Sequence, residues 1–199
     1  MGAKINIGFV KSDVSTFNGN YYCLIDFLNN NGMKVKGITF STNKNGLKWV
    51  EISNPHVSET KKLVDELKKA YYCEFKVTDF PYYNNSYVDV VIRIDIYGDD
   101  FYSFTLEMEE AFIIQSYEIS DLEFVETFII NFMKTFCRKL KMDYAFSCQE
   151  AEVVFSPEKF KNLTQPYYSI EARYDDHNNL KISKASWYIN GVTNRKIKD

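Results

Sequence analysis

The pattern of apolar and polar residues predicts a β-α-β-β-α-β order for the first part of the chain. Strands alternate apolar and polar side chains, whereas helices repeat apolar ones every three or four residues. Leu24, Ile25 and Leu28 thus share one helix face, and Asn45-Gly46 marks a hairpin. This is the order of a ferredoxin-like sandwich. The predicted elements are strand 4–10, helix 18–31, strands 34–42 and 47–53, helix 58–71 and strand 73–78.

Beyond a joint expected at 80–86, the pattern predicts an antiparallel strand meander. The strictest alternation in the chain lies at 87–97, where valine and isoleucine point to one side. Gly98-Asp99-Asp100 turns the chain after this strand. The other strands of the meander are predicted at 101–108 and 111–117.

Residues 120–141 form the longest predicted helix, with apolar side chains at helical spacing. Ser120 and Glu123 fit a capping box, in which each side chain accepts a backbone N–H of the first turn. Strands are expected after this helix at 143–147 and 152–155. A C-terminal hairpin is predicted from strands 167–174 and 180–189, across a turn at 175–179.

The predicted class is therefore α+β: a β-α-β-β-α-β N-terminal half, then an antiparallel meander with one long amphipathic helix and a C-terminal hairpin. We expect one compact unit over 1–199, with two subdomains at 1–80 and 86–199.

The composition indicates a cytoplasmic protein that binds neither membrane nor nucleic acid. No apolar run reaches the roughly 18 residues that cross a bilayer. A net charge of −3 is unlike the basic face of a nucleic-acid binder. Four cysteines without CxxC spacing are expected to be buried free thiols in a reducing compartment. These are Cys23, Cys73, Cys137 and Cys148.

The sequence predicts no catalytic residue, no metal site and no cofactor. The two histidines are His56 and His177. Asp175, Asp176 and His177 could ligate a metal, but Asp-Asp-His-Asn-Asn is also typical of a solvated turn. Phosphate-binding loops, nucleophile elbows and zinc-protease motifs are absent from the sequence.

Acidic residues are concentrated between positions 89 and 126. This stretch holds eleven acids and Arg93 as its only base, in a chain whose net charge is −3. Such segregation is typical of a solvated outer face, and also of a surface that steers and docks a basic partner. The docking residues expected here are Asp95, Asp99, Asp100, Glu107, Glu109 and Glu110.

The long helix 120–141 and the segment after it resemble the predicted immunity proteins of bacterial polymorphic toxin systems, of the immunity protein 64 type. That segment is Tyr144-Ala-Phe-Ser-Cys-Gln-Glu-Ala-Glu-Val-Val-Phe155, which contains the small and acidic run Gln149-Glu150-Ala151-Glu152. The resemblance covers the second half of the chain. It implies a bacterial cytoplasmic protein that binds and neutralises one cognate toxin without turnover, and it assigns no functional residue.

Three hypotheses of function therefore stay open. The first is an inhibitor that docks on a basic toxin through the acidic stretch. The second is an enzyme or small-ligand-binding domain with a site in a cleft between the two halves, near 80–86; it requires a deep pocket with convergent polar groups. The third is a homodimer that pairs exposed strand edges.

Overall fold

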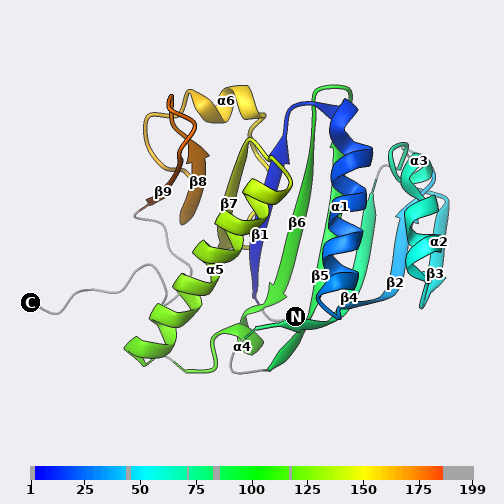
Figure 1. Cartoon of the computed structure of the whole chain (residues 1–199), viewed down its shortest axis with the longest axis horizontal. Coiled ribbons are helices and arrows are strands. Elements are labelled where there is room, and N and C mark those ends of the chain that lie inside the picture. Colours follow the sequence, from blue (N-terminus) through cyan, green and yellow to red (C-terminus); the bar gives the residue numbers. More distant parts are fainter. Residues whose placement is uncertain (1–2, 44–45, 71, 83–85, 117, 186–199) are drawn as a thin grey trace, which may run out of the picture. The chain divides into compact units, whose positions relative to one another are not determined.

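The computed structural model describes residues 3–43, 46–70, 72–82, 86–116 and 118–185 (Figure 1). The chain divides into two compact units. The first unit is Met1–Val10 with Glu107–Asp199, and the second unit is Lys11–Leu106. Each unit combines helices with antiparallel strands, which confirms the α+β class. The joint expected at 80–86 falls within the second unit, with 83–85 outside the described residues.

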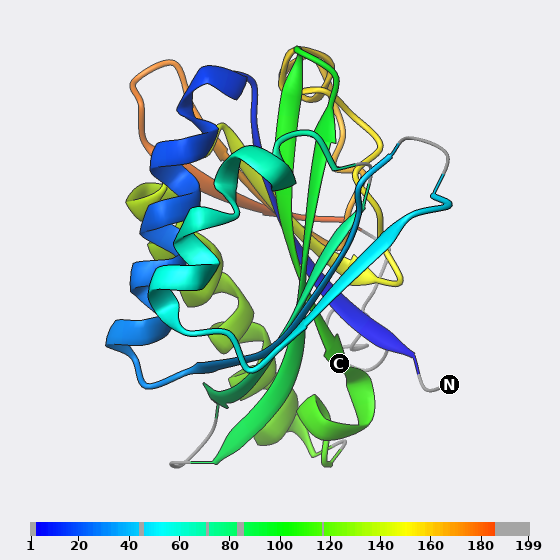
Figure 2. The ribbon, with the colours of Figure 1, turned by 90° about the vertical axis from the view of Figure 1, so that its right-hand side faces the viewer.

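The second unit contains strands in the order β3-β2-β4-β5-β6. Figure 2 shows α1 and the α2–α3 segment on the same side of β2 and β4. Asn45 of the predicted hairpin lies outside the described residues. The elements are β1 (Lys4–Lys11, which begins in the first unit), η1 (Val14–Thr16), α1 (Phe17–Asn30), β2 (Lys34–Ser41), β3 (Trp49–Ser53), α2 (Val57–Lys62), α3 (Val64–Leu67), β4 (Cys73–Pro81), β5 (Tyr87–Tyr97) and β6 (Phe101–Glu109, which ends in the first unit).

The core of the second unit follows the predicted periodicities. In β5 the alternation buries Val90, Ile92 and Ile94, and the intervening side chains are half-buried or exposed. Tyr21 of α1 packs edge-on against Phe75 of β4, with ring centroids 6.2 Å apart. Burial raises the pKa of the Tyr21 hydroxyl. The α1 face that periodicity predicted is therefore the face that covers the strands.

The strand pairing differs from a ferredoxin-like sandwich, although the chain order β-α-β-β-α-β is present with its second helix split into α2 and α3. In the structure β4 pairs with β2 and β5, and β1 pairs with β7 of its own unit. Ile5 thus lies opposite Gln149, far along the chain. Local order constrains which elements form, but it leaves the choice of distant partner strands open.

The first unit contains strands in the order β1-β7-β8-β9. The C-terminal hairpin is confirmed for 170–184; residues 186–189 of its predicted second strand lie outside the described ranges. The remaining elements of this unit are α4 (Glu110–Ile113), α5 (Ile119–Lys139), β7 (Tyr144–Gln149), α6 (Pro157–Lys161), β8 (Ile170–Tyr174) and β9 (Leu180–Lys184).

Both faces of β1 and β7 are covered within the first unit. On one face Phe9 of β1 packs against aromatic rings of α5, which crosses these strands in Figure 1. On the other face Tyr144 stacks on Phe160 of α6, with centroids 3.8 Å apart. Beside this pair Phe146 stacks on Tyr168 at 3.9 Å. Because β7 alternates its side chains, one strand joins two apolar layers.

Two predictions around α5 are wrong. The segment predicted as strand 111–117 begins with α4, where the Glu110 amide donates to the Ala3 carbonyl at 2.8 Å and Ile113 is buried. The capping box is also absent. Helix α5 starts at Ile119 after the N-cap Glu118, so Ser120 lies inside the first turn. Residues 111–116 thus form the end of a short helix and a loop, and they pair with no strand.

Candidate functional site

Three of the six predicted docking acids lie in the second unit. Asp95 is on the less buried face of β5, and its carboxylate pairs with Arg93 at 2.9 Å. Asp99 and Asp100 lie together in the β5–β6 turn, where both are exposed. Within the described residues these two carboxylates have no ion pair. The only base of the acidic stretch therefore compensates Asp95 and leaves the turn negatively charged.

The other three predicted acids lie together at the end of β6 and the start of α4, in the first unit. The Lys4 ammonium pairs with Glu107 at 2.7 Å. Glu109 is the N-cap residue of α4. The Glu110 carboxylate accepts a hydrogen bond from the side-chain amide of Gln149. Glu110 is thus connected to Gln149 at the end of β7, a residue of the run that the resemblance had singled out.

Glu150 joins the same cluster, although it was not among the predicted docking residues. Its carboxylate accepts the Lys4 backbone N–H at 2.6 Å, and its own N–H donates to the Lys4 carbonyl at 2.9 Å. Glu150 adopts a positive φ of 52°, and the chain turns away from β7 there. Glu107 and Glu150 therefore both contact Lys4, and Glu110 contacts Gln149, the residue before Glu150.

The predicted strand Glu152–Phe155 is wrong, because this extended segment is held by side chains and joins no strand ladder. The Tyr168 hydroxyl donates to the Glu152 carbonyl at 2.9 Å and accepts the Val154 N–H at 3.0 Å. The Tyr144 hydroxyl donates to the Phe155 carbonyl at 2.6 Å. Backbone groups need partners, and here two buried tyrosines supply them.

A groove of about 690 Å³ lies beside this segment in the first unit. It is lined by residues 148–152, Val154, Tyr167 and Tyr168, and we call it the Tyr167 groove. Val154 is 55% exposed and Tyr167 is 48% exposed, whereas Tyr168 is buried. The groove therefore combines two exposed apolar surfaces with the side chains of Glu150 and Glu152.

An ion pair between the buried Glu171 carboxylate and the partly exposed Arg173 guanidinium positions one wall of the Tyr167 groove. The Glu171 carboxylate, which is fully buried, accepts the backbone N–H groups of Tyr167 at 2.6 Å and Tyr168 at 3.0 Å. Arg173 donates to the same carboxylate at 2.7 Å and to the Leu163 carbonyl at 3.1 Å. Charge-assisted hydrogen bonds of this kind hold the loop before β8 in one geometry.

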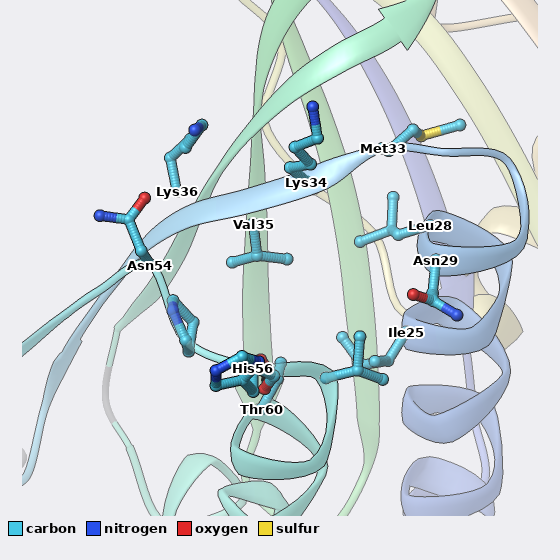
Figure 3. A pocket seen from close by; sticks show the side chains of 12 residues that line it. Ile25, Leu28, Asn29, Met33, Lys34, Val35, Lys36, Asn54, His56 and Thr60 are labelled. Atoms are coloured by element: carbon cyan, nitrogen blue, oxygen red, sulfur yellow. Dashed lines mark hydrogen bonds between the residues drawn. The ribbon is translucent and has the colours of Figure 1, made fainter.

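The second unit has a smaller hollow of about 320 Å³, lined by α1, β2 and the start of α2. Figure 3 shows Val35 and His56 facing it, while Lys34 and Lys36 extend from the other side of β2. Lys34 pairs with Asp79 at 3.0 Å and thereby lowers the pKa of the Asp79 carboxyl. The residues that line this hollow include two lysines and no acid, whereas a surface that docks a basic partner is acidic.

The run at 175–179 forms a hydrogen-bonded turn between β8 and β9. The Asp175 carboxylate accepts the N–H groups of Asn179 at 2.8 Å and His177 at 3.0 Å, and these bonds lower its pKa. Across the described ranges, no three histidine, cysteine, aspartate or glutamate side chains gather as metal ligands do.

The cysteines differ from one another in exposure, and the prediction of burial is wrong for Cys23, which is exposed. Cys73 and Cys137 are buried, and burial raises the pKa of the Cys73 thiol. Cys148 is half-buried in the Tyr167 groove, with its sulfur 3.0 Å from the Ser169 hydroxyl. All four are free thiols.

The comparison with protein families covers almost the whole chain. The sequence model of immunity protein 64 matches residues 1–195. The chain belongs to the immunity protein 64 family. No curated protein and no solved structure matches it. In the described part of this family member, no helix is both long enough and apolar enough to span a membrane.

The match extends the resemblance seen in the second half of the sequence to both units of this immunity protein 64 family member. The run 149–152, quoted for that resemblance, lines the Tyr167 groove. Sequence reasoning missed Val154 and Tyr167 as surface features. Periodicity placed both in strands, and only the exposed fraction of each side chain in the folded unit distinguishes them.

Proposed function

We propose that this immunity protein 64 family member binds one cognate basic toxin in the bacterial cytoplasm and neutralises it without turnover. The observation that carries the proposal is the family match over residues 1–195. Clustered charge increases the rate and selectivity of association more than its affinity. The proposed docking residues are Asp95, Asp99, Asp100, Glu107, Glu109 and Glu110.

These acids differ in their ion pairs within the protein, so we expect them to contribute differently to docking. Asp95 and Glu107 are compensated by Arg93 and Lys4, so each contributes little net charge to a distant partner. Asp99 and Asp100 project from a turn and are both exposed. We therefore assign most of the electrostatic steering to this turn.

The experiment that tests the proposal uses the protein encoded by the adjacent upstream gene as the candidate toxin. The two proteins are co-expressed, the complex is isolated, and its mass is measured by light scattering beside that of each protein alone. We expect a stable complex and complete loss of toxin activity at one immunity protein per toxin. The mass of the immunity protein alone tests the homodimer hypothesis in the same measurement.

Two results would contradict the proposal. Absence of a complex at micromolar concentration would remove the inhibitor function. Complete loss of toxin activity at a small fraction of one equivalent would require turnover and would favour the enzyme hypothesis instead.

A further inference from the structure

Strand β3 is an edge strand of the second unit, and among the described residues it pairs only with β2. The Asn54 N–H, directly after β3, donates to the Lys36 carbonyl at 2.9 Å. Backbone groups alternate in direction along an antiparallel strand, so the even-numbered residues of β3 face β2. The N–H and carbonyl groups of the odd-numbered residues therefore point away from β2. These residues are Trp49, Glu51 and Ser53.

This edge lacks the features that usually prevent the addition of another strand. Edge strands are commonly protected by lysine, by proline or by a bulge. The segment Trp49–Ser53 contains neither lysine nor proline, and its register with β2 is unbroken. Strand β9, which ends the strand order of the first unit, carries Lys181 and Lys184. Figure 2 shows β3, in cyan, as the outermost strand beside β2. Strand β3 is therefore open to pairing with a further strand.

Trp49 provides this edge with an aromatic side chain that is already held in place. Its indole N–H donates to the Gly46 carbonyl at 2.7 Å, and its ring packs edge-on against Tyr72, with centroids 5.7 Å apart. Trp49 is nevertheless 51% exposed, and the nearby Leu47 is 78% exposed. Tryptophan is enriched among the residues that dominate binding energy, and a side chain fixed in advance loses little entropy on binding.

Two kinds of strand could occupy this edge, and Glu51 distinguishes them. Glu51 is exposed, and within the described residues its carboxylate has no ion pair. A second copy that paired symmetrically and antiparallel through all three outward-facing residues would place the two Glu51 side chains directly opposite each other. Like charges in that position are destabilising, whereas opposite charges are stabilising. The edge therefore fits a strand of another protein with a basic residue opposite Glu51.

We propose that β3 is the docking edge for the cognate toxin, which adds an extended strand to it. That strand carries an arginine or lysine opposite Glu51 and an apolar side chain against Trp49. In this mode of recognition the main-chain hydrogen bonds supply affinity, and the alternating side chains supply specificity. The proposal rests on the proposed function, because it names the surface through which the toxin is bound.

Amide hydrogen exchange tests strand addition directly. It is measured by NMR on the full chain, alone and in complex with the upstream gene product. The amides of residues 49, 51 and 53 should exchange at least about tenfold more slowly in the complex, because each becomes hydrogen-bonded there. The amides of residues 50 and 52 face β2 in both states and serve as the internal reference.

The two proposals fail in different ways in this experiment. If a complex forms and the three edge amides exchange as fast as in the free protein, the β3 assignment is wrong while the proposed function stands. If no complex forms, the proposed function is wrong and the β3 assignment with it.

Three variants of the full chain separate the contributions to binding, measured by surface plasmon resonance. Trp49→Ala removes the aromatic side chain, and Glu51→Gln removes the charge but keeps the backbone N–H. Glu51→Pro removes the charge and also the outward N–H, and proline is tolerated at such positions of an edge strand. We expect Trp49→Ala and Glu51→Pro each to raise the Kd by about tenfold or more, and Glu51→Gln by about threefold, chiefly through faster dissociation.

Glu66→Gln is the matched control, because Glu66 is an exposed acid on α3 of the same unit. Urea unfolding of each variant separates lost contact from lost folding. Variants of β3 that fold and bind as tightly as Glu66→Gln would remove this strand from the docking surface. A dimer of the immunity protein alone that Glu51→Pro dissociates, seen by light scattering, would make a second copy the occupant and overturn the proposal.

Discussion

Glu171 is a fully buried carboxylate that ties three parts of the first unit together. It accepts two backbone N–H groups from the loop before β8 and pairs with Arg173, which in turn donates to Leu163. The Arg173 guanidinium also lies 5.1 Å from the centroid of the Phe160 ring. Burying an unpaired charge costs free energy, and these contacts offset that cost for the Glu171 carboxylate.

Replacing Glu171 by alanine should therefore destabilise the protein. The change leaves Arg173 without its anion and two N–H groups without an acceptor, and we expect a loss of about 3 kcal/mol in the free energy of unfolding. Urea denaturation measures it. Glu158→Ala, an exposed position on α6, should change the free energy by less than about 0.5 kcal/mol. Equal values for the two variants would show that the Glu171 contacts contribute nothing to stability.

Strands β1 and β7 approach each other closely where Gly8 faces Phe146. The two residues are direct partners in the antiparallel ladder. A β-carbon on Gly8 would overlap the Phe146 ring, which is itself stacked on Tyr168. Glycine is thus required at this position by the volume of a neighbouring ring, and it lets the aromatic layer beside the Tyr167 groove sit flat on the sheet.

The matched pair Gly8→Ala and Gly19→Ala tests this packing. Gly8→Ala forces the Phe146 ring to move and should cost about 1–3 kcal/mol of stability. Gly19 lies in α1, where an added β-carbon meets nothing within 4 Å. Gly19→Ala should therefore stabilise by roughly 0.5–1 kcal/mol through helix propensity. Chemical denaturation of the unmodified protein and of both variants, analysed with one shared m-value, gives the two changes in the free energy of unfolding. A Gly8→Ala variant that is as stable as the unmodified protein would contradict the close approach of Gly8 to the Phe146 ring.

The distribution of charge belongs to the whole molecule. The eleven acids of residues 89–126 are distributed over both units. Arg93 compensates the charge of Asp95, and Lys4 compensates the charge of Glu107. The exposed turn with Asp99 and Asp100 keeps its charge. Electrostatic steering of a partner depends on uncompensated charge close to the docking surface. The net charge of the protein, in contrast, attracts a partner toward every part of the surface alike.

Reversing both charges of this turn, Asp99→Lys with Asp100→Lys, should lower the association rate constant for the cognate toxin. We expect about a tenfold decrease at low ionic strength, with a smaller salt dependence, and little change in the dissociation rate. Stopped-flow association at several salt concentrations measures this. The control, Asp176→Lys with Glu158→Lys, changes the net charge equally at exposed sites elsewhere. Equal slowing by both double variants would assign the effect to net charge and remove the turn from the docking surface.

The sequence by itself determined the elements whose signals are local. The alternation of β5, the apolar stripe of α5 and the C-terminal hairpin are all present in the described residues, because side-chain periodicity follows directly from backbone geometry. It also determined the concentration of acids at 89–126. Helix α5 nevertheless begins at Ile119, because several residues near a helix start compete for the N-cap position.

Only the tertiary structure decided which strands pair and what the acids contact. The pairing of β1 with β7 depends on contacts between distant segments, which periodicity does not encode. The same holds for Glu152–Phe155, whose strand-like pattern is satisfied by the hydroxyls of Tyr144 and Tyr168. The Tyr167 groove joins the end of β7 to the loop before β8, and it exists because those two strands are neighbours in the folded sheet.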